Sequence, residues 1–409
     1  MDIKITMYDV VIIGGGAAGL FLAANLPTSN ALLLEHRETA GKKLLITGGG
    51  MCNLTNTQSI EAFLQHFGSR AQRNFLLPSF QAFPPSALMQ WFETRGVPLT
   101  VREDGKVFPA SLDAHEVRDM LVRESKAKIQ YNSKITSVIR DGDHFSVQTE
   151  GGVITSRNLV LATGGMSYPI TGSDGSGYAI AKALGHSIIP PKPALAAIMV
   201  EAYHWTHLAG NAVRSAYAEF HHAGEKKRFL QATGDILFTH DGLSGPLILT
   251  SSRELKAGDS ITFSLVPLEH KVHVPEQLLV LLTSQPKKQI TTILKEFGLA
   301  ASLAQQVVEE LDFEATITPA NLNKRQRQNL IRAITERRFI IKGIKGFNAA
   351  MVTSGGVCLK EVERGSMESK VMDHLHFCGE ILDVDGQSGG YNLQAAFSTA
   401  YCTANHIQP

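Results

Sequence analysis

The sequence has few cysteines, no long apolar run and almost no net charge. Its four cysteines stand far apart and form no CxxC pair, which excludes a zinc ribbon and a redox-active dithiol and suits a reduced cytosol better than a disulfide scaffold. No run approaches the about 18 apolar residues of a membrane span, and the N-terminus leads almost directly into a strand, without room for a signal peptide. The formal charge of +1 over 409 residues gives no global field for nucleic acid or membrane. We therefore expect a cytoplasmic protein with no membrane segment and no metal site.

Glycine, in contrast, is abundant and clustered. The first cluster among the 36 glycines follows the apolar run Tyr8–Ile13, which predicts a strand buried on both faces. An apolar helical stretch comes next, and a second strand, "ALLLE", ends in a carboxylate. This order matches the GxGxxG dinucleotide fingerprint: Gly14 would make the tight turn, Gly16 would admit a pyrophosphate, and Gly19 would pack the helix against the strand. The helix N-terminus would face the phosphates, and Glu35 would accept the ribose hydroxyls of an adenosine.

The same fingerprint binds NAD or FAD, and the rest of the chain favours FAD. An NAD dehydrogenase usually continues with further βαβ units, whereas here the glycine-rich excursion "HRETAGKKLLITGGG" follows the acid at once. Two later strands, in 157–165 and 375–380, also end in small residues, and a glycine pair opens a helix expected from about Asn392 to Ala404. Each end of the chain thus brings a glycine-cleared junction to one site. One would hold the ADP half, and the other the ribityl chain and the pyrimidine end of the flavin.

The excursion contains the unusual stretch "KKLLITGGGMCNLTN" at 42–56. Its apolar triplet, Leu44–Ile46, is strand-like, and the basic pair before it suits either a pyrophosphate or a solvated surface. We expect the glycine triplet to let the chain pass against the flavin, with Asn53 supplying a hydrogen bond. Cys52 would then lie near the ring, either as a small residue that fills a tight corner or as an acid.

The motifs together resemble one family. The segments "DVVIIGGGAAGL", "GKKLLITGGGMCNLTN", "LVLATGGMSYPITGSDGSGYAIAKALGH", "LFTHDGLSGP" and "FCGEILDVDGQSGGYNLQAAFSTAY" resemble those of the BaiN/YhiN-type NAD(P)/FAD-dependent oxidoreductases, sometimes labelled aminoacetone-oxidase-like flavoproteins. These segments lie in the family's order and are distributed along most of the chain, from residue 9 to residue 401. Two departures are Met51, where the family often has an arginine, and Lys42-Lys43 in place of Arg-Lys. We therefore expect no anionic-ligand role at position 51.

The resemblance implies an α/β fold in three parts. A doubly wound FAD-binding domain (Rossmann-like, glutathione-reductase-type) would carry an inserted β-barrel-like domain with a small helical insertion. The residues agree independently: short strands and turns alternate from about Ala194 to Val266, and apolar residues then recur at i, i+3 and i+4 from Pro275 to about Arg338. We expect the FAD domain at 1–190 and 348–409, the β-rich domain at 191–274 with a return at 339–347, and the helical domain at 275–338.

The expected cofactor site joins the glycine junctions. It combines the fingerprint, the basic pair, the glycine triplet, the small residues after the two later strands and the start of the last helix. In full, we expect the flavin to be bound by Gly14, Gly15, Gly16, Ala17, Ala18, Gly19, Glu35, Lys42, Lys43, Gly48, Gly49, Gly50, Asn53, Val138, Thr163, Gly164, Gly165, Gly379, Glu380, Asp383, Gly389, Gly390, Tyr391, Asn392 and Leu393.

The resemblance implies that hydride passes from NAD(P)H through the flavin to an activated C=C bond, in a uridine of ribosomal RNA or in a small-molecule enone. Because the glycines of 171–185 lack a preceding strand and acid, we expect them to cap a helix beside the flavin; NAD(P)H would dock transiently, with ping-pong kinetics. The proton donor candidates are Cys52, Tyr168, Tyr391 and His240, the last being equally well a structural histidine. Oxidation of a small amine by oxygen is the alternative reaction. An RNA-binding or assembly protein with a structural FAD is the alternative of another class.

One local excess of positive charge bears on the substrate. Residues 323–346 contain eight basic residues and only one acidic residue, Glu336. Such a patch can bind along a phosphate backbone, so it would suit an RNA substrate, whereas a small-molecule enone or an amine would not need it. Pairing with "EELDFE" at 309–314 would instead make it a solvated helix face. The patch consists of Lys324, Arg325, Arg327, Arg332, Arg337, Arg338, Lys342 and Lys345.

Overall fold

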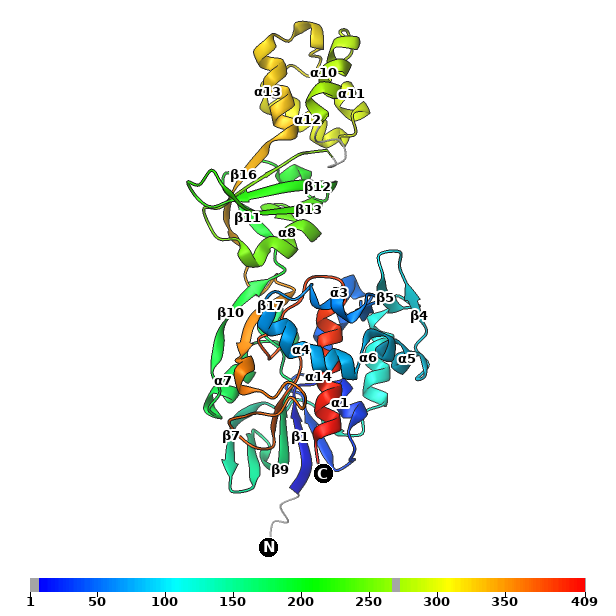
Figure 1. Ribbon diagram of the computed structural model, residues 1–409, viewed down its shortest axis with the longest axis vertical. Coiled ribbons are helices and arrows are strands. Elements are labelled where there is room, and N and C mark those ends of the chain that lie inside the picture. The colour runs from blue at the N-terminus through cyan, green and yellow to red at the C-terminus, as the bar shows by residue number, and fades with distance from the viewer. Residues whose placement is uncertain (1–6, 267–272, 409) are drawn as a thin grey trace. The chain divides into compact units, whose positions relative to one another are not determined.

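The computed structural model describes residues 7–266 and 273–408. Residues 1–6 and 267–272, which the sequence assigns to the start of the FAD domain and to the end of the β-rich domain, lie outside the described residues, as does residue 409. The chain divides into two compact units, Met1–Ala194 with Phe347–Pro409, and Leu195–Gly346 (Figure 1). The first unit contains a Rossmann-type sheet and the second a closed barrel, so the predicted fold class is confirmed. The predicted domain boundaries stay predictions.

A mixed seven-stranded sheet forms the centre of the first unit. Its strands are, in spatial order, β6 (Lys128–Gln130), β2 (Ala31–Leu34), β1 (Met7–Ile13), β9 (Gly152–Leu161), β8 (His144–Thr149) and β7 (Ile135–Asp141), with β18 (Leu375–Phe377) also beside β9. β1 lies between β2 and β9 and is parallel to both. The long strand β9 takes two neighbours in succession: residues 152–156 pair antiparallel with β8, and residues 159–161 pair in parallel with β18. The C-terminal part of the chain therefore returns to the sheet that the N-terminus begins.

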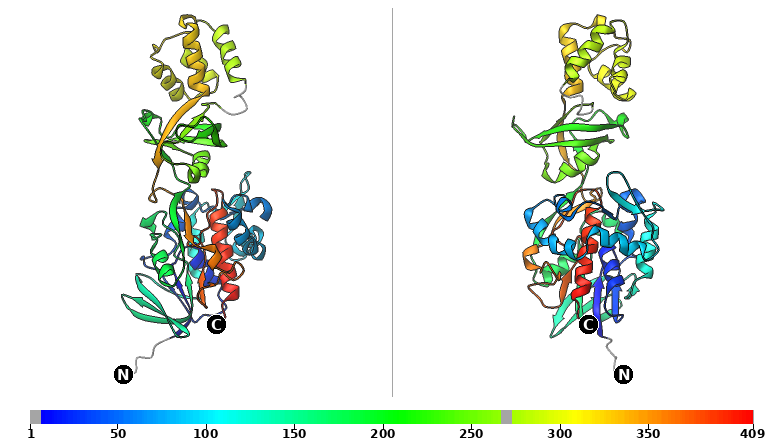
Figure 2. Two further views of the ribbon diagram at one scale, coloured as in Figure 1. Left: turned by 60° about the vertical axis from the view of Figure 1, so that its left-hand side comes forward. Right: turned by 45° about the vertical axis from the view of Figure 1, so that its right-hand side comes forward.

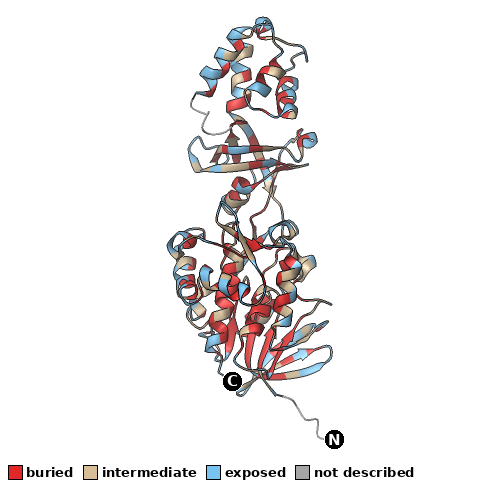
Figure 3. Ribbon diagram, turned by 90° about the vertical axis from the view of Figure 1, so that its right-hand side faces the viewer, coloured by how far each residue is buried: buried red, intermediate tan, exposed pale blue. Residues whose placement is uncertain are grey.

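Both faces of this sheet are buried, which explains the continuous apolar run of β1. Val10 and Ile12 belong to one hydrophobic core, and Val11 and Ile13 belong to another. Successive side chains of a strand point to opposite faces, so a strand covered on both faces is apolar at every position. The buried strands are drawn in red between more exposed helices in Figure 3.

Two helices from opposite ends of the sequence pack together on this sheet. They are α1 (Ala17–Asn25) and α14 (Tyr391–His406), and the rings of Phe21 and Phe397 lie 4.9 Å apart between them. Figures 1 and 2 show the red α14 beside the blue N-terminal elements. The other helices of the unit are α3 (Ile60–Leu64), α4 (Arg70–Ala82), α5 (Pro85–Glu93), α6 (Ala114–Arg123) and α7 (Ser176–Ala183).

The stretch at 42–56 differs from its expected structure. Leu44–Ile46 is not a strand: a four-residue helix, α2 (Lys42–Leu45), runs directly into the 3-10 turn η1 (Thr47–Gly50). So short a helix has no room to display an apolar period, which is why three apolar residues resemble a strand. The chain then enters a small antiparallel sheet of β3 (Thr55–Asn56), β5 (Lys106–Pro109) and β4 (Leu99–Val101).

A separate two-stranded sheet carries the chain to and from the second unit. It pairs β10 (Ile188–Ala194) antiparallel with β17 (Val352–Val357), and Ala194 lies opposite Val352. The points at which the chain leaves and re-enters the first unit are therefore neighbours. This geometry is what an inserted domain requires.

The second unit combines an antiparallel barrel with a helical insertion. The barrel consists of β11 (Ile198–Val200), β14 (Gly242–Ser244), β13 (Arg228–Phe238), β12 (Ala212–His221), β15 (Ser260–Phe263) and β16 (Arg337–Ile344), which closes on β11. The helices are α8 (Pro246–Ser251), α10 (Val274–Ser284), α11 (Ile290–Glu296), α12 (Ala301–Glu310) and α13 (Lys324–Thr335). Barrel residue Phe263 and helix residue Leu330 belong to one continuous core. No helix in the described part of the chain is long and apolar enough to cross a membrane.

Candidate cofactor and active site

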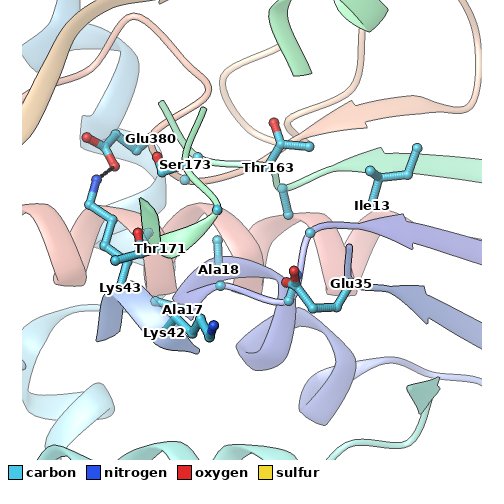
Figure 4. A pocket seen from close by; sticks show the side chains of 18 of the residues that line it. Ile13, Ala17, Ala18, Glu35, Lys42, Lys43, Thr163, Thr171, Ser173 and Glu380 are labelled. Atoms are coloured by element: carbon cyan, nitrogen blue, oxygen red, sulfur yellow. Dashed lines mark hydrogen bonds and ion pairs between the residues drawn. The ribbon is translucent and has the colours of Figure 1, made fainter. Parts of the chain in front are cut away.

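A cavity of about 480 Å³ lies in the first unit, at the carboxyl ends of β1 and β9. Doubly wound sheets bind their ligands at this edge. Three stretches that are distant in sequence line it, within 13–47, 133–180 and 351–399, together with Leu76 of α4. Among the predicted cofactor residues, those that line the cavity are Gly14, Gly15, Gly16, Ala17, Ala18, Glu35, Lys42, Lys43, Thr163, Gly164, Gly379, Glu380, Asn392 and Leu393 (Figure 4).

The glycine turn after β1 leaves space at only one of its fingerprint positions. Gly14 has φ +108°, and a Cβ there would lie 2.5 Å from the carbonyl oxygen of Ala162. A Cβ on Gly19 would overlap the carbonyl oxygen of Gly14, so this glycine is needed for close packing. Gly16 has ordinary extended backbone, and a Cβ on it would meet no described atom within 4 Å. The open space beside Gly16 belongs to the cavity.

The acid at the end of β2 is fixed beside this turn. The Glu35 carboxylate is 7% exposed and accepts hydrogen bonds from the N–H groups of Gly15 at 2.9 Å and Arg37 at 2.8 Å. Nδ1 of His36 also lies 3.3 Å from Oε1 of this carboxylate. A carboxylate has about four acceptor positions, so at least one remains for a ligand hydroxyl. The next residue, His36, also lines the cavity, and its buried Nε2 has no hydrogen-bond partner among the described residues.

Two further buried polar atoms at the cavity wall have no hydrogen-bond partner in the described part of the chain. They are the hydroxyl oxygens of Thr163 and Ser173. A buried polar group without a partner costs about 1–3 kcal/mol, and a bound ligand with polar groups would recover this. The cavity therefore fits a polar organic cofactor. Sequence reasoning missed several lining residues, namely His36, Thr39, Ser133, Lys134, Thr136, Thr171, Gly172, Ser173, Met351 and Val352.

Both predicted lysines line the cavity, and both have a carboxylate partner. Lys42, the first residue of α2, pairs with Glu38 in the loop before the helix. Lys43 reaches across the cavity wall to Glu380, with 2.6 Å between Nζ and Oε2. Lys43 therefore links the N-terminal excursion to the segment that follows β18.

The glycine triplet does not line the cavity. Gly48, Gly49 and Gly50 have φ values of +59°, +70° and +90°, a left-handed conformation that glycine adopts far more readily than other residues, and this accounts for the lack of side chains at these positions. This turn directs Cys52 into the hydrophobic core, where the thiol is fully buried and burial raises its pKa to about 12. The structure does not bring Cys52 to the cavity.

The side chain of Asn53 forms hydrogen bonds with backbone groups of three other residues. With its amide nitrogen toward the carbonyls of Thr55 and Val107, at 3.0 and 3.2 Å, its oxygen accepts from the N–H of Gly390 at 3.0 Å. Asn53 thus ties the small sheet to the start of α14. Other predicted cofactor residues outside the cavity wall are Gly19, Val138, Gly165, Asp383, Gly389, Gly390 and Tyr391.

None of the remaining candidate acids is among the residues that line the cavity. Tyr391 is 4% exposed, its ring stacks 3.9 Å from that of His66, and burial, with the Asp104 carboxylate as a second cause, raises its pKa to about 12. His240 is exposed and belongs to the second unit. Tyr168 has a left-handed backbone, with φ +53°, at the start of a 3-10 turn.

Asp383 does not line the cavity either, although its neighbours Leu382 and Val384 do. Burial, with a further contribution from the Asp385 carboxylate, raises the pKa of Asp383 to about 6. The structure therefore disfavours a charge at this position near the cavity.

Comparison with known proteins identifies the family. A family model described as "HI0933-like protein Rossmann domain" matches residues 8–406. The chain belongs to the HI0933-like family. The family resemblance of the sequence motifs is thereby confirmed.

Named relatives of this HI0933-like chain are enzymes. It is 31% identical to a ribosomal RNA dihydrouridine synthase from Escherichia coli, with 98% of each chain covered. It is 32% identical to an enzyme of the same name from Haemophilus influenzae, with 97% of this chain and 98% of the relative covered. It is 30% identical to a 3-dehydro-bile acid delta(4,6)-reductase from Clostridium scindens, over 97% of this chain and 98% of the relative. The expected oxidoreductase class is confirmed.

Solved structures share the fold of this HI0933-like chain. A 3-ketosteroid-delta4-(5alpha)-dehydrogenase from Rhodococcus jostii is 13% identical with a TM-score of 0.51, over 99% of this chain and 98% of that chain. A quinol fumarate reductase chain from Escherichia coli is 14% identical with a TM-score of 0.50, over 98% of this chain and 70% of that chain. At this identity the likeness extends to the fold alone.

Proposed function

We propose that the protein is an FAD-dependent oxidoreductase that passes a hydride from NAD(P)H through the flavin to an activated C=C bond. The observation that carries this proposal is the cavity, in which an open glycine turn, a fixed acid and unpartnered buried hydroxyls come together. The bound flavin would supply the hydride chemistry, and the protein would orient the reactants and exclude water. A relative that is named a delta(4,6)-reductase supports this class of reaction.

Particular residues would hold the cofactor. Glu35 would accept hydrogen bonds from the adenosine ribose, and the space beside Gly16 at the start of α1 would take the pyrophosphate. The hydroxyls of Thr163 and Ser173 would gain their missing hydrogen bonds. Asn392, at the start of α14, would lie toward the flavin half of FAD. NAD(P)H would dock transiently.

We propose a uridine of ribosomal RNA as the substrate, ahead of a small-molecule enone. Sequence identity alone does not decide between the two substrates, because the relatives named ribosomal RNA dihydrouridine synthases and the bile-acid reductase have similar sequence identities to this chain. The exposed face of α13 favours RNA: Lys324, Arg325 and Arg332 are exposed, and no acid lies between the first and last of them. A basic surface of this kind suits a phosphate backbone. An RNA substrate also accords with a cytoplasmic location.

The predicted basic patch is smaller than its sequence indicates. Arg337 forms two hydrogen bonds with Glu310 at 2.5 and 2.7 Å, and its guanidinium lies over the Trp205 ring. The side chains of three other basic residues are engaged as well: Arg327 with the Pro319 carbonyl, Arg338 with Ser260 and Lys345 with Asp241. These contacts stabilise the second unit, and the remaining patch residue, Lys342, is exposed on β16. We propose the three exposed residues of α13 as the RNA-binding surface.

Mass spectrometry of nucleosides from total ribosomal RNA tests the substrate. Cells that lack the gene should lose a dihydrouridine that a plasmid copy of the gene restores. A plasmid copy with Gly16→Val, which blocks the proposed cofactor site, should not restore it. Unchanged dihydrouridine after deletion would contradict the RNA substrate, and purified protein that reduces a steroid-like enone would then favour the small-molecule reaction.

A further inference from the structure

The ion pair of Lys43 and Glu380 lies at one end of the cavity. Lys43 belongs to α2 and Glu380 follows β18, and both line the cavity. The two side chains are 22% and 21% exposed, so they are neither solvated nor sealed in the core. In Figure 4 they lie on the far side of Ala17 and Ala18 from Glu35.

A hydrogen-bond network fixes this pair. The Lys43 ammonium donates to the hydroxyl of Ser167, a fully buried residue, and that hydroxyl donates to Glu380 Oε1 at 3.1 Å. The backbone N–H of Thr353 donates to the same oxygen at 2.8 Å. Charge-assisted bonds to fixed backbone and buried groups restrict both side chains. The two opposite charges are therefore held in constant positions at the cavity wall.

The position of the pair determines what it can influence. Glu35 marks the adenosine end of the proposed FAD and the glycine turn marks its pyrophosphate, so the end of the cavity beyond the turn faces the redox-active ring. Two-electron reduction adds negative charge to that ring. A nearby cation therefore makes reduction easier and a nearby anion makes it harder.

We propose that the Lys43–Glu380 pair sets the reduction potential of the bound flavin, with Lys43 raising it and Glu380 lowering it. This inference rests on the proposed function, because it requires FAD in the cavity. In the intact pair the two effects largely cancel. Pairing thus prevents the shift that either charge alone would cause, so that NAD(P)H can still reduce the cofactor and the acceptor can still reoxidise it.

The alternative is that the pair only clamps α2 to the segment after β18. The two hypotheses predict different signs for the changes in reduction potential when Lys43 or Glu380 is removed. If the pair is a clamp, removal of either partner loosens the same contact and has the same kind of effect. If the pair sets the potential, removal of Lys43 leaves an unpaired anion and removal of Glu380 leaves an unpaired cation, with opposite effects.

The test measures the reduction potential of the flavin in Lys43→Met, Glu380→Gln and the double variant. The potential is measured by redox titration against indicator dyes at pH 8, and the flavin-to-protein ratio is determined first. We expect Lys43→Met to lower the reduction equilibrium about tenfold and Glu380→Gln to raise it about tenfold, each about 30 mV for a two-electron couple. The double variant should return close to the wild type. Lys182→Met, on the exposed side of α7, is the control and should leave the potential unchanged.

Shifts in the same direction, or no shift in either single variant, would overturn the inference. Glu380→Gln alone decides the matter if Lys43→Met does not fold, because glutamine keeps an acceptor for the Thr353 N–H and a rise in potential is then still required. Loss of flavin from both single variants would identify the pair as a structural clamp. Wild-type protein that binds no FAD would instead contradict the proposed function itself.

Discussion

At the scale of single residues, a substitution at Gly16 should affect cofactor binding without affecting folding. Its backbone suits any amino acid, and a side chain there would meet only cavity space. We expect Gly16→Val to fold with a thermal midpoint close to the wild type, yet to purify without flavin, because the valine occupies the space of the pyrophosphate. The flavin-to-protein ratio and thermal unfolding provide the measurements.

Gly19→Ala is the matched control for this prediction. Its methyl group would overlap the Gly14 carbonyl, so it should lower the thermal midpoint and lose flavin only through loss of the fold. Full flavin occupancy in Gly16→Val would mean that the pyrophosphate lies elsewhere.

Cys52 provides a second test among single residues. Because its thiol is fully buried in the hydrophobic core, Cys52→Ala should cost about 1 kcal/mol of unfolding free energy and should leave both half-reactions near their wild-type rates. Urea denaturation and stopped-flow kinetics measure the two effects. A general acid would behave differently, since its removal typically slows the acceptor step by about 10²- to 10⁴-fold. A loss of that size would return the catalytic role to Cys52.

Elements differ in how far the sequence predicts them. The junction around Gly14 could be predicted because strand, glycines, helix and acid follow each other locally, and each has its own pattern. The role of the glycine triplet could not, because a turn-forming glycine and one that admits a ligand are the same letter. The partnership of Lys43 with Glu380 joins residues 337 positions apart. It depends on tertiary contacts such as the pairing of β18 with β9, which no local sequence pattern indicates.

At the scale of elements, the exposed face of helix α13 can be tested for RNA binding. Its buried side holds Leu330 and Ile334, while Lys324, Arg325 and Arg332 are exposed. Replacement of these three basic residues by glutamine should weaken RNA binding for all sequences. Each lost phosphate contact should reduce the slope of log K against log salt by roughly 0.7 to 0.9. Binding isotherms at several salt concentrations measure this slope.

A charge-retaining variant is the control for the helix. Lys324→Arg, Arg325→Lys and Arg332→Lys together keep the positive charge and should keep the salt dependence, because phosphate contacts depend chiefly on charge. Flavin content and its reduction by NAD(P)H should be normal in both triple variants. Equal RNA affinity in the glutamine variant and the wild type would make this face of α13 an ordinary solvated surface.

The whole molecule contains two units with separate hydrophobic cores. One core lies wholly within Leu195–Gly346, and the two cores on the faces of the large sheet lie wholly within the other unit. Since Ala194 and Val352 are paired neighbours, a short glycine-serine linker can replace residues 195–346. The shortened protein should fold and bind FAD but should lose its salt-dependent affinity for RNA. Flavin content and RNA binding measure the two outcomes, and a shortened protein that folds without flavin would contradict the assignment of the cofactor site to the first unit alone.

The register of β9 has a consequence for the order of events during synthesis. The last residues of β9 pair with β18, and the inner face of α1 packs against α14, and both partners are among the last segments to be synthesised. These surfaces of β9 and α1 therefore stay uncovered until nearly the whole chain has left the ribosome. Meanwhile residues 195–346 can fold, because their core needs nothing translated later. The cofactor can therefore be loaded only after translation is almost complete, and until then the nascent chain exposes apolar surface that chaperones bind.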